Sequence, residues 1–319
     1  MIVKMKMKPT RDGYGEGLLE LGKTNPLVLV LDADLSKSTR TDWFMKEFPE
    51  RFFDIGIAEQ DMLGTAAGLA LAGKIPFVTT YGVFVAGRAW DQIRTTIAYA
   101  ELNVKIAGAH GGISVGPDGA THQALEEITL MRVLPNMILV VPCDAIETKK
   151  ATLALASLQG PAYLRFTREA SPVFTSESDI FEIGKSITLK KGTDLTLIGC
   201  GPIVYEALMA AEELNKLGIS TRVINMHTIK PLDKETIIKA ALETGAIVTV
   251  EEHQVMGGLG GAVAEILVQN SPVPVEMIGI QDTFGESGTP EELAEKYGLT
   301  SRHIIEASKK VLKRKTCRA

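Results

Sequence analysis

The stretch Asp54-Ile-Gly-Ile-Ala-Glu59-Gln-Asp61 joins a strand-like approach at 51–53 to a run of small residues at 62–73. That run, MLGTAAGLALAG, carries no charge, which indicates a buried helix packed closely against a neighbour. Glu59 stands at or near the first turn of this helix, where a carboxylate interacts favourably with the helix dipole. Its small and apolar neighbours favour a second role, because a desolvated carboxyl can hold or share a proton near neutrality. The stretch therefore makes Glu59 a candidate for exchanging a proton with a ring nitrogen.

Length and composition indicate a globular protein of two domains. The chain has 319 residues, and about 150 residues per domain is a fair expectation. It is 45% hydrophobic and 23% charged with a formal net charge of -5, so we expect no nucleic acid as its main partner. No apolar run approaches the ~20 residues that span a bilayer, so we expect no membrane either. The cysteines at 143, 200 and 317 lack metal-site spacing, which predicts a reduced, cytoplasmic protein.

Apolar runs alternate with helical patterns along the chain, and this order predicts an α/β fold with two doubly wound, mostly parallel sheets. In the first half we expect strands at 27–31, 75–80, 104–108, 137–141 and 162–166, with helices at 11–22, 88–100, 124–134 and 145–159. In the second half we expect strands at 195–198, 221–225, 246–250 and 275–280, with helices at 204–217, 234–244 and 258–270. The pattern lapses between 171 and 192, which predicts a first domain at 1–180 and a second at 181–319.

A glycine-rich loop from Ala109 to Gln123 holds the strongest cluster of polar side chains. It contains His110, Asp118 and His122 together with four glycines, and glycine lets the backbone approach a ligand closely. Two imidazoles and a carboxylate offer hydrogen bonds to hydroxyl groups and a group that titrates near neutrality. A metal site and a purely structural loop are the alternatives, and the lack of a third compact ligand weighs against the metal.

Two pairs of side chains at the ends of predicted strands are further candidates. Tyr81 and Phe84 are either core residues or a pair that stacks on a flat ring. Arg165 and Arg168 either form surface ion pairs or take a sugar phosphate in bidentate fashion. Ligands bind outside the carboxyl ends of strands in such sheets, so we expect these side chains at one edge with Glu59.

Two charged segments of the second half have a less defined role. The pair Glu252-His253 follows a predicted strand, and it fits either a cleft between the domains or an exposed strand end. The basic run at 309–315 is expected to be a solvated helix end.

Together these motifs resemble the pyrimidine-binding domain of transketolase-like enzymes that depend on thiamine diphosphate. The matching residues are Gly56-Ile-Ala-Glu59-Gln60, Tyr81 with Phe84, and the segment His110…Asp118-Gly-Ala-Thr-His122-Gln123. The stretch 171–319 is similar to the C-terminal domain of the same family. The resemblance implies that Glu59 binds the ring nitrogen of the cofactor's aminopyrimidine and assists its activation, while Tyr81 and Phe84 flank that ring.

The resemblance also implies how a sugar phosphate is bound. Asp118 would contact a substrate hydroxyl, and His110 and His122 would bind substrate oxygens and take part in proton transfer. Arg40 and Arg168 match phosphate-binding arginines of the family. The cofactor carries the carbon–carbon chemistry and the protein orients it, and no metal ligand is expected in this chain.

One departure from the family pattern concerns the other half of the cofactor site. Full-length members begin with a domain that holds the diphosphate through Gly-Asp-Gly, a later Asn and a divalent metal, whereas this sequence contains no Gly-Asp-Gly. The resemblance therefore implies the C-terminal subunit of a split transketolase, whose N-terminal partner carries Gly-Asp-Gly and Mg²⁺. Two copies of each subunit, ketol transfer between sugar phosphates and a place in the pentose phosphate pathway would follow. The chain alone is expected to be inactive.

Three other functions stay open at the level of the sequence. A 1-deoxyxylulose 5-phosphate synthase shares Gly-Ile-Ala-Glu-Gln and the Thr-His pair, but it is usually one long chain. The β subunit of a 2-oxo-acid dehydrogenase is naturally split and of similar size, whereas the loop from Asp118 to His122 favours sugar phosphates. A non-catalytic assembly subunit is disfavoured because Glu59 and the loop histidines are retained. Pro117 and Ala120 differ from the acid and the proline usual in transketolases, which concerns substrate preference.

Overall fold

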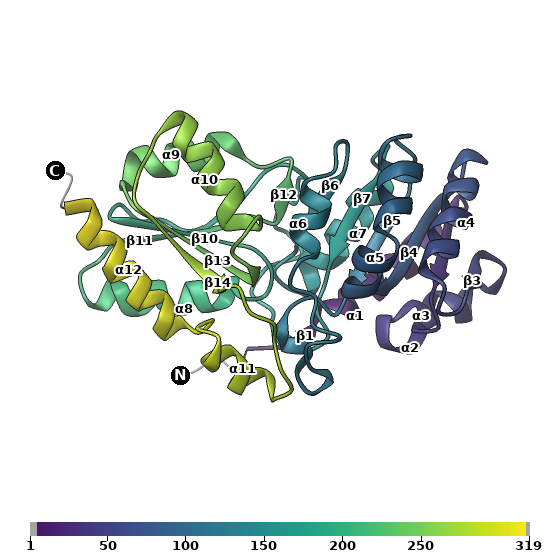
Figure 1. The fold of residues 1–319 in the computed structure, drawn as a ribbon, viewed down its shortest axis with the longest axis horizontal. Helices are drawn as coiled ribbons and strands as arrows, with labels where there is room; N and C mark the ends of the chain where they lie inside the picture. Colours follow the sequence, from purple (N-terminus) through teal and green to yellow (C-terminus); the bar gives the residue numbers. More distant parts are fainter. Residues whose placement is uncertain (1–4, 317–319) are drawn as a thin grey trace.

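Two α/β domains lie side by side in the computed structural model, which describes residues 5–316 (Figure 1). The strands of the first sheet are β2 (Val28–Asp32), β3 (Phe52–Asp54), β4 (Ile75–Tyr81), β5 (Lys105–Ala109), β6 (Ile138–Val140), β7 (Ala162–Arg165) and β12 (Thr228–Lys230). Their order across the sheet is β12-β6-β7-β5-β4-β2-β3. Six of them run parallel, and β12 joins in the antiparallel direction.

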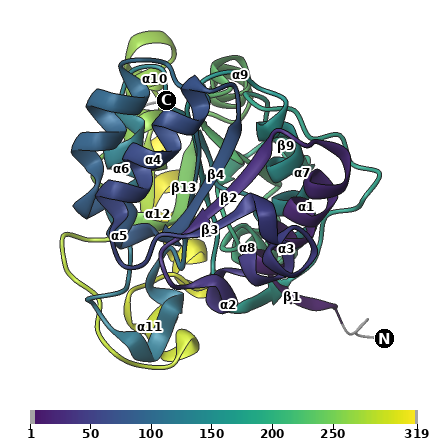
Figure 2. The same ribbon diagram turned by 90° about the vertical axis from the view of Figure 1, so that its right-hand side faces the viewer.

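Helices cover both faces of this sheet (Figure 2). One face carries α1 (Thr10–Thr24), α3 (Thr41–Glu47) and α7 (Ala145–Ala156), and the other carries α4 (Glu59–Leu71), α5 (Gly82–Arg88) and α6 (Glu127–Arg132). A strand between two helical layers has both of its faces covered, and β2 is accordingly buried at every position. The predicted doubly wound α/β architecture is confirmed.

The second domain holds a smaller sheet of the same kind. Its strands are β9 (Ile187–Lys190), β10 (Leu195–Gly199), β11 (Thr221–Asn225), β13 (Ile247–Gln254) and β14 (Val275–Ile280). They follow the order β14-β13-β10-β11-β9 and are parallel except for the edge strand β9. The helices α8 (Val204–Lys216) and α12 (Ser301–Thr316) cover one face, and α9 (Lys234–Thr244) and α10 (Leu259–Asn270) cover the other (Figure 1).

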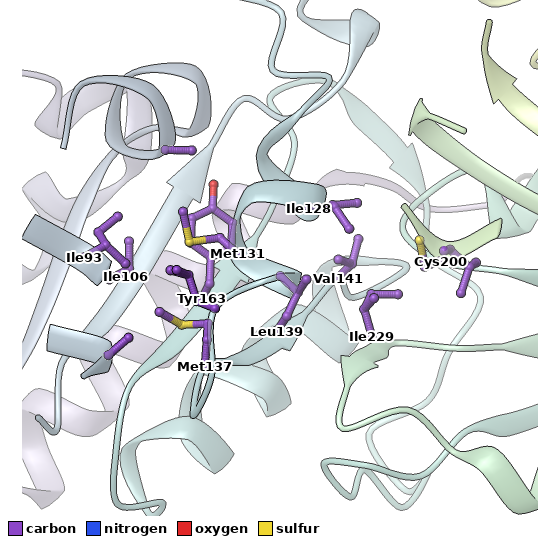
Figure 3. Packing of buried hydrophobic residues seen from close by; sticks show 14 of the residues in the cluster. Ile93, Ile106, Ile128, Met131, Met137, Leu139, Val141, Tyr163, Cys200 and Ile229 are labelled. Carbon is purple, nitrogen blue, oxygen red and sulfur yellow. The ribbon is translucent and has the colours of Figure 1, made fainter. Parts of the chain in front are cut away.

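One hydrophobic cluster runs from the first domain into the second (Figure 3). It includes Ile93 and Ile106 of the first domain, passes Val141 and reaches Cys200 and Ile229. Each of these side chains is at most 2% exposed. Burying an aliphatic side chain of this size contributes ~1.5–3 kcal/mol, so the shared core holds the two domains in a defined relative position.

The C-terminal segment was not predicted as two helices. The short helix α11 (Pro290–Lys296) precedes α12, and the basic run at 309–315 lies in the last turns of α12. Lys310 and Arg314 of this run remain 69% and 49% exposed, and both pair with Glu276 of β14, at 2.8 and 2.6 Å. Cys317 lies outside the described residues. Within residues 5–316, no helix combines the length and the apolar composition that a membrane crossing requires.

Two features of the first sheet differ from the prediction. The three-residue strand β12 follows β11 along the chain but pairs with β6 of the first sheet, and so short a strand carries no periodicity of its own. The helix predicted at 88–100 is divided, because α5 already ends at Arg88 and a π-helix occupies Gln92–Ala98. The chain passes from β4 into α5 at Tyr81–Gly82 without a loop, which places Phe84 on a helix.

Close packing of α1 on α7 makes Gly13 a test of this fold. A Cβ added at Gly13 would lie 2.0 Å from the carbonyl oxygen of Ala145. We expect Gly13→Ala to lower the free energy of unfolding by ~2 kcal/mol, because overpacking outweighs the gain in helix propensity. The matched control is Gly64→Ala in α4, where an added Cβ meets no atom within 4 Å and stability should stay or rise. Equal unfolding free energies of the two variants in denaturant titrations would contradict this packing.

Candidate active site

Five strands of the first sheet deliver polar candidates to one edge. β2 ends at Asp32, β4 ends at Tyr81, and β5 runs directly into His110. β3 leads through residues 55–58 to Glu59, and β7 leads through residues 166–167 to Arg168. These are the carboxyl ends of parallel strands, where ligands bind in open α/β sheets.

A cavity of about 360 Å³ opens at this edge. Five predicted residues line it together, namely Glu59, Tyr81, Phe84, Asp118 and His122. The remaining lining residues are Ala33, Asp34, Leu35, Ile57 and Arg88. Residues from distant parts of the chain that were predicted separately thus share one cavity.

Glu59 faces this cavity from the start of α4 and is only 4% exposed. Its carboxylate pairs with Arg88, whose Nη1 lies 3.1 Å from Oε1 and 3.4 Å from Oε2. The Arg88 guanidinium also lies over the ring of Phe84, with Cζ 4.2 Å from the ring centre. The Arg88 guanidinium therefore contacts the ring face of Phe84 and the carboxylate of Glu59, the group predicted to bind a pyrimidine ring.

Tyr81 and Phe84 form a stack with the two loop histidines. The rings of Tyr81 and Phe84 are nearly parallel, at 19°, with centres 5.9 Å apart. The Tyr81 ring also stacks on His110 at 4.1 Å, while His122 meets Phe84 edge-on at 5.3 Å. Since both aromatic rings line the cavity, they are available to a ligand and are not simply core residues.

His110 is the buried member of the loop at 110–123. It is 1% exposed with a φ of 60°, and its Nδ1 has no hydrogen-bond partner within residues 5–316. Burial lowers the pKa of His110 to about 3, and the nearby cations Arg11 and Arg168 act in the same direction. The imidazole is therefore neutral at pH 7. For His110, the prediction of a group that titrates near neutrality is wrong.

Of the two arginines that match phosphate-binding arginines of the family, Arg168 is the one that reaches a residue of the cavity. Its Nη1 lies 3.1 Å from Oδ1 of Asp118. Arg40 does not line the cavity. Its Nε pairs with Asp12 at 2.7 Å, and its guanidinium lies 5.7 Å from the ring centre of Trp43.

Arg11, which the sequence analysis did not single out, completes a group of three cations at this edge. Its Nη1 donates to the carbonyl of Ser38 at 2.9 Å, and its buried Nε has no hydrogen-bond partner among the described residues. Burial lowers the pKa of Arg11, and the positive charges of Arg40 and Arg168 lower it further. Three guanidinium groups therefore lie close enough to act on one another, and the carboxylates of Asp12 and Glu169 offset part of their positive charge.

The buried carboxylate of Asp32 shapes the segment that carries Arg40. It accepts hydrogen bonds from the backbone N–H of Leu35 at 2.6 Å and from the hydroxyls of Thr39 and Thr41 at 3.0 and 2.7 Å. These bonds close the turn between α2 (Ser36–Thr39) and α3, where Arg40 has a φ of 70°. Burial raises the pKa of Asp32 to about 6. Its bonding partners give Asp32 a structural role.

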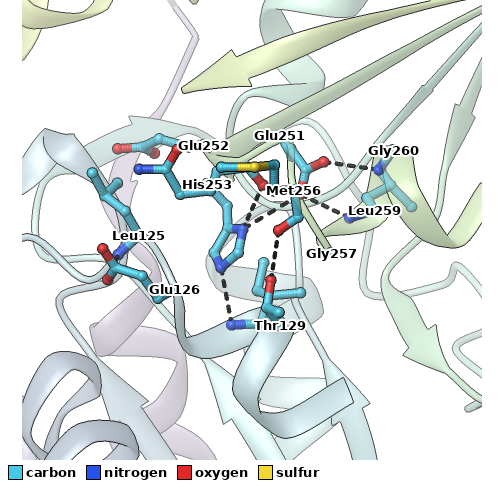
Figure 4. Close-up of polar contacts among 12 residues, drawn as sticks. Leu125, Glu126, Thr129, Glu251, Glu252, His253, Met256, Gly257, Leu259 and Gly260 are labelled. Atoms are coloured by element: carbon cyan, nitrogen blue, oxygen red, sulfur yellow. Dashed lines mark hydrogen bonds and ion pairs between the residues drawn. The ribbon is translucent and has the colours of Figure 1, made fainter. Parts of the chain in front are cut away.

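Three other candidates lie in the joint between the domains, and Figure 4 shows two of them, Glu252 and His253. Arg165 is 2% exposed; its Nε lies 2.5 Å from Oε1 of Glu127, and its Nη2 donates to the carbonyl of Glu252 at 2.8 Å. His253 is fully buried, and its Nε2 accepts the backbone N–H of Ile128 at 3.2 Å. The readings of Arg165 as a surface or phosphate-binding group and of Glu252-His253 as an exposed strand end are therefore wrong.

The spacing of Phe84 and Arg88 is the signal that would have identified Arg88. The two residues are four apart on α5, which puts them on one face of a helix. The helix predicted from the sequence begins only at Arg88. Phe84 therefore lies outside that predicted helix, and the four-residue spacing does not place the two side chains on one face. Arg11 has no comparable signal, because its role depends on Arg40 and Arg168 lying nearby in space.

The cavity suits the pyrimidine end of thiamine diphosphate. A carboxyl shielded from water and two accessible aromatic faces are what an aminopyrimidine ring needs for hydrogen bonding and stacking. Among residues 5–316, no group of three or more His, Cys, Asp or Glu side chains is arranged to hold a metal ion.

A shielded carboxyl beside an aromatic pair, at the carboxyl edge of a parallel sheet, defines the pyrimidine-binding part of a thiamine diphosphate-dependent enzyme. Residues 6–173 match the transketolase pyrimidine-binding domain, and residues 184–304 match the transketolase C-terminal domain. The chain belongs to the transketolase family.

Relatives of similar length exist as separate subunits. A protein of Methanocaldococcus jannaschii, assigned as a transketolase C-terminal section, is 48% identical over 95% of this chain and 97% of its own length. The 6-deoxy-6-sulfo-D-fructose transketolase subunit SqwH of a Clostridium species is 41% identical over 99% of this chain and 98% of its own. A solved split-gene transketolase, described as an inactive β4 tetramer, superposes with a TM-score of 0.90 at 50% identity, covering 96% of this chain and 98% of that one.

The buried state of His110 leads to a prediction about its protonation. The pKa of His110 in the folded chain is about 3, below the ordinary value of 6.5. As the pH falls, this imidazole is therefore protonated in the unfolded chain before it is protonated in the folded chain. The burial of His110 therefore weakens the fold as the pH falls from 6.5 toward 3. In NMR spectra of histidine-labelled protein, the signal that disappears in His110→Asn should not shift between pH 5 and 8. A midpoint above pH 5 for that signal would contradict the assignment.

Proposed function

We propose that this chain is the C-terminal subunit of a two-subunit transketolase, which transfers a two-carbon ketol unit between sugar phosphates. The proposal rests on one observation: Glu59, Tyr81, Phe84, Asp118 and His122 all line the same cavity. Two relatives of similar length support it, one named as a transketolase C-terminal section and the other as a transketolase subunit. The transketolase names of these relatives also favour transketolase over the synthase and dehydrogenase alternatives.

In this proposal, Glu59 controls a proton on the cofactor. Bound thiamine diphosphate supplies the nucleophilic carbon that cleaves and rejoins carbon–carbon bonds. The Glu59 carboxyl binds the ring nitrogen of the aminopyrimidine and holds or receives the proton there. Because this carboxyl is shielded from water, the hydrogen bond forms in a low dielectric, where it is stronger. Tyr81 and Phe84 stack on the ring and keep water from it.

The loop at 110–123 and the arginines bind the sugar. Asp118 and His122 line the cavity and are assigned to substrate hydroxyls, with His122 as the candidate for proton transfer. His110 is buried and does not line the cavity of Glu59; being neutral, it does not act as an acid, and its unpartnered Nδ1 is the atom assigned to a substrate oxygen. Arg168, with Arg11 and Arg40 nearby, takes the anionic end of the sugar. The Clostridium relative is named for a sulfosugar, and a sulfonate is an anion of this kind.

We assign the exposed face of α4 to the partner subunit. An added Cβ would meet no atom within 4 Å at Gly64 or Gly68, and Leu71 and Ile57 are 76% and 74% exposed. Small residues four apart let another element approach closely, and exposed apolar side chains mark an interaction surface. Because Glu59 begins this helix, a partner on the α4 face would complete the cavity.

The partner is assigned the remaining half of the cofactor site. It carries Gly-Asp-Gly and Mg²⁺ for the diphosphate, and two copies of each subunit share the sites. The description of a solved β4 assembly as inactive supports the expectation that this chain alone does not turn over. A cytoplasmic location, in keeping with the spacing of the cysteines, and a place in the pentose phosphate pathway belong to the same proposal.

The test is ketol transfer from xylulose 5-phosphate to ribose 5-phosphate with thiamine diphosphate and Mg²⁺. We expect activity only after this chain is mixed with the subunit that carries Gly-Asp-Gly. Glu59→Ala should lower kcat by at least ~100-fold because the acid is lost, while the mixed complex elutes unchanged in size exclusion. Glu213→Ala, an exposed acid on α8 of the second domain, is the control and should keep its activity. A wild-type rate for Glu59→Ala would contradict the catalytic role assigned to Glu59.

Arg88 should compete with the cofactor for Glu59. The Arg88 side chain is half-exposed, so its ion pair with Glu59 and its contact with the Phe84 ring each contribute only modestly to the free energy. We expect Arg88→Ala to bind thiamine diphosphate about 3- to 10-fold more tightly in the mixed complex, measured by fluorescence titration. Arg94→Ala, at an exposed position of the following π-helix, serves as control. Weaker binding by Arg88→Ala would show that Arg88 supports Glu59 and does not compete for it.

A further inference from the structure

The loop that carries His110, Asp118 and His122 is attached to both domains. We call residues 110–123 the histidine loop. At its start, the backbone N–H of Gly111 donates to the carbonyl of Phe166, a residue of the first domain. Its middle forms the short helix η3 (Ile113–Asp118), which lies against α11 of the second domain.

Glu252 of β13 makes the strongest polar contact with this middle part. Its Oε1 accepts the backbone N–H of Ser114 at 2.6 Å. A Cβ added at Gly112 would lie only 2.2 Å from the same oxygen, so the carboxylate packs directly on the loop backbone. Burial raises the pKa of Glu252, whereas the charge of Arg165 and the bond from Ser114 act in the opposite direction and favour the ionised form, which is the stronger acceptor. The second domain thus holds the loop at a point between His110 and Asp118.

Glu252 is itself held in place from the first domain. It is 8% exposed, and its carbonyl oxygen accepts a hydrogen bond from Arg165. Arg165 in turn pairs with Glu127. This chain of contacts leads from α6 through the domain joint to Ser114, and every side chain in it is buried. A buried, bonded carboxylate has little freedom to move, so it can serve as a fixed point for the loop.

A second contact holds the end of the same loop. Nε2 of Gln123 donates to the carbonyl of Glu286 at 2.9 Å and to the carbonyl of Ile113 at 3.2 Å. At Gly119, beside Asp118, an added Cβ would lie 2.6 Å from Oγ of Ser287. The segment at 284–290 therefore packs on the loop close to the residues that line the cavity.

We propose that Glu252 is a positioning residue, through which the second domain holds the histidine loop so that Asp118 and His122 face the substrate. Glu252 does not line the cavity of Glu59 and touches neither ring of the aromatic pair. Its loss should therefore affect substrate binding and leave cofactor binding intact. The proposal rests on the proposed function for the identity of the substrate, but the holding of the loop is a property of this chain alone.

The neighbouring Glu251 provides a matched control. Figure 4 shows the two carboxyls on opposite sides of β13, as expected for successive residues of a strand. Glu251 is also fully buried, but it accepts the backbone N–H groups of Leu259 and Gly260 at the start of α10, each at 2.8 Å. Replacing either acid removes a buried carboxylate from the same strand, and only one of the two contacts the histidine loop.

The first experiment is amide hydrogen exchange on the full chain. We expect Glu252→Ala to speed exchange of residues 112–119 by about 10- to 100-fold, because the Ser114 N–H loses a charged acceptor. Glu252→Gln keeps an acceptor oxygen of the same reach and should give a smaller increase. Glu251→Ala should leave these amides unchanged and speed exchange at residues 259–262 instead. Unchanged exchange in both Glu252 variants, or equal loosening by Glu251→Ala, would overturn the proposal.

The second experiment is kinetic and uses the complex with the partner subunit. Glu252→Ala should raise the KM for the sugar phosphates by about 10-fold while the affinity for thiamine diphosphate stays unchanged, and Glu252→Gln should recover part of the loss. An equal loss of cofactor affinity would indicate general damage and contradict the positioning role. If the wild-type complex shows no ketol transfer, the proposed function fails, and the exchange experiment still decides whether Glu252 holds the loop.

Discussion

The arrangement of the two domains depends on the contacts of one buried side chain, the guanidinium of Arg165. It leaves the first sheet at the end of β7, pairs with Glu127 of α6 and donates to the carbonyl of Glu252 in β13. A cation removed from water is tolerated only when partners satisfy its charge and its hydrogen-bond donors. A shift of the second domain would take away the Glu252 carbonyl and leave a buried N–H of Arg165 without its acceptor, while the pair with Glu127 lies within the first domain. The hydrophobic cluster that continues to Ile229 resists the same shift.

This joint gives the second domain a part in the site although none of its residues lines the cavity of Glu59. The site has a rigid component and a mobile component. Tyr81 stacked on a buried His110 is rigid, because both rings are confined by their neighbours. Arg88 is half-exposed and is held by one ion pair and one ring face, so a planar ligand that offers the same two interactions can replace it.

The sequence was sufficient to find Glu59, Tyr81, Phe84, Asp118 and His122, because each lies in a short motif at the end of a predicted strand. It was insufficient where a role depends on segments that are far apart. The pairing of β12 with β6 joins residues 228–230 to 139–140. Arg11 joins the cation group only because α1 begins beside the end of β7, and Arg40 turns away from the cavity because Asp12 is its partner.

By itself, the sequence determined the central strands and the long helices between them, the family resemblance and the residue types at the sheet edge, but not the short elements β9, β12 and α11. These properties follow from local periodicity and short motifs, which a single chain displays directly. Only the tertiary structure decided which charges are buried and which partners neutralise them. Ser114 and Glu252 are 138 positions apart, and no local pattern records such a contact. The neutral state of His110, the covering of Glu59 by Arg88 and the burial of Arg165 all arise from contacts of this long-range kind.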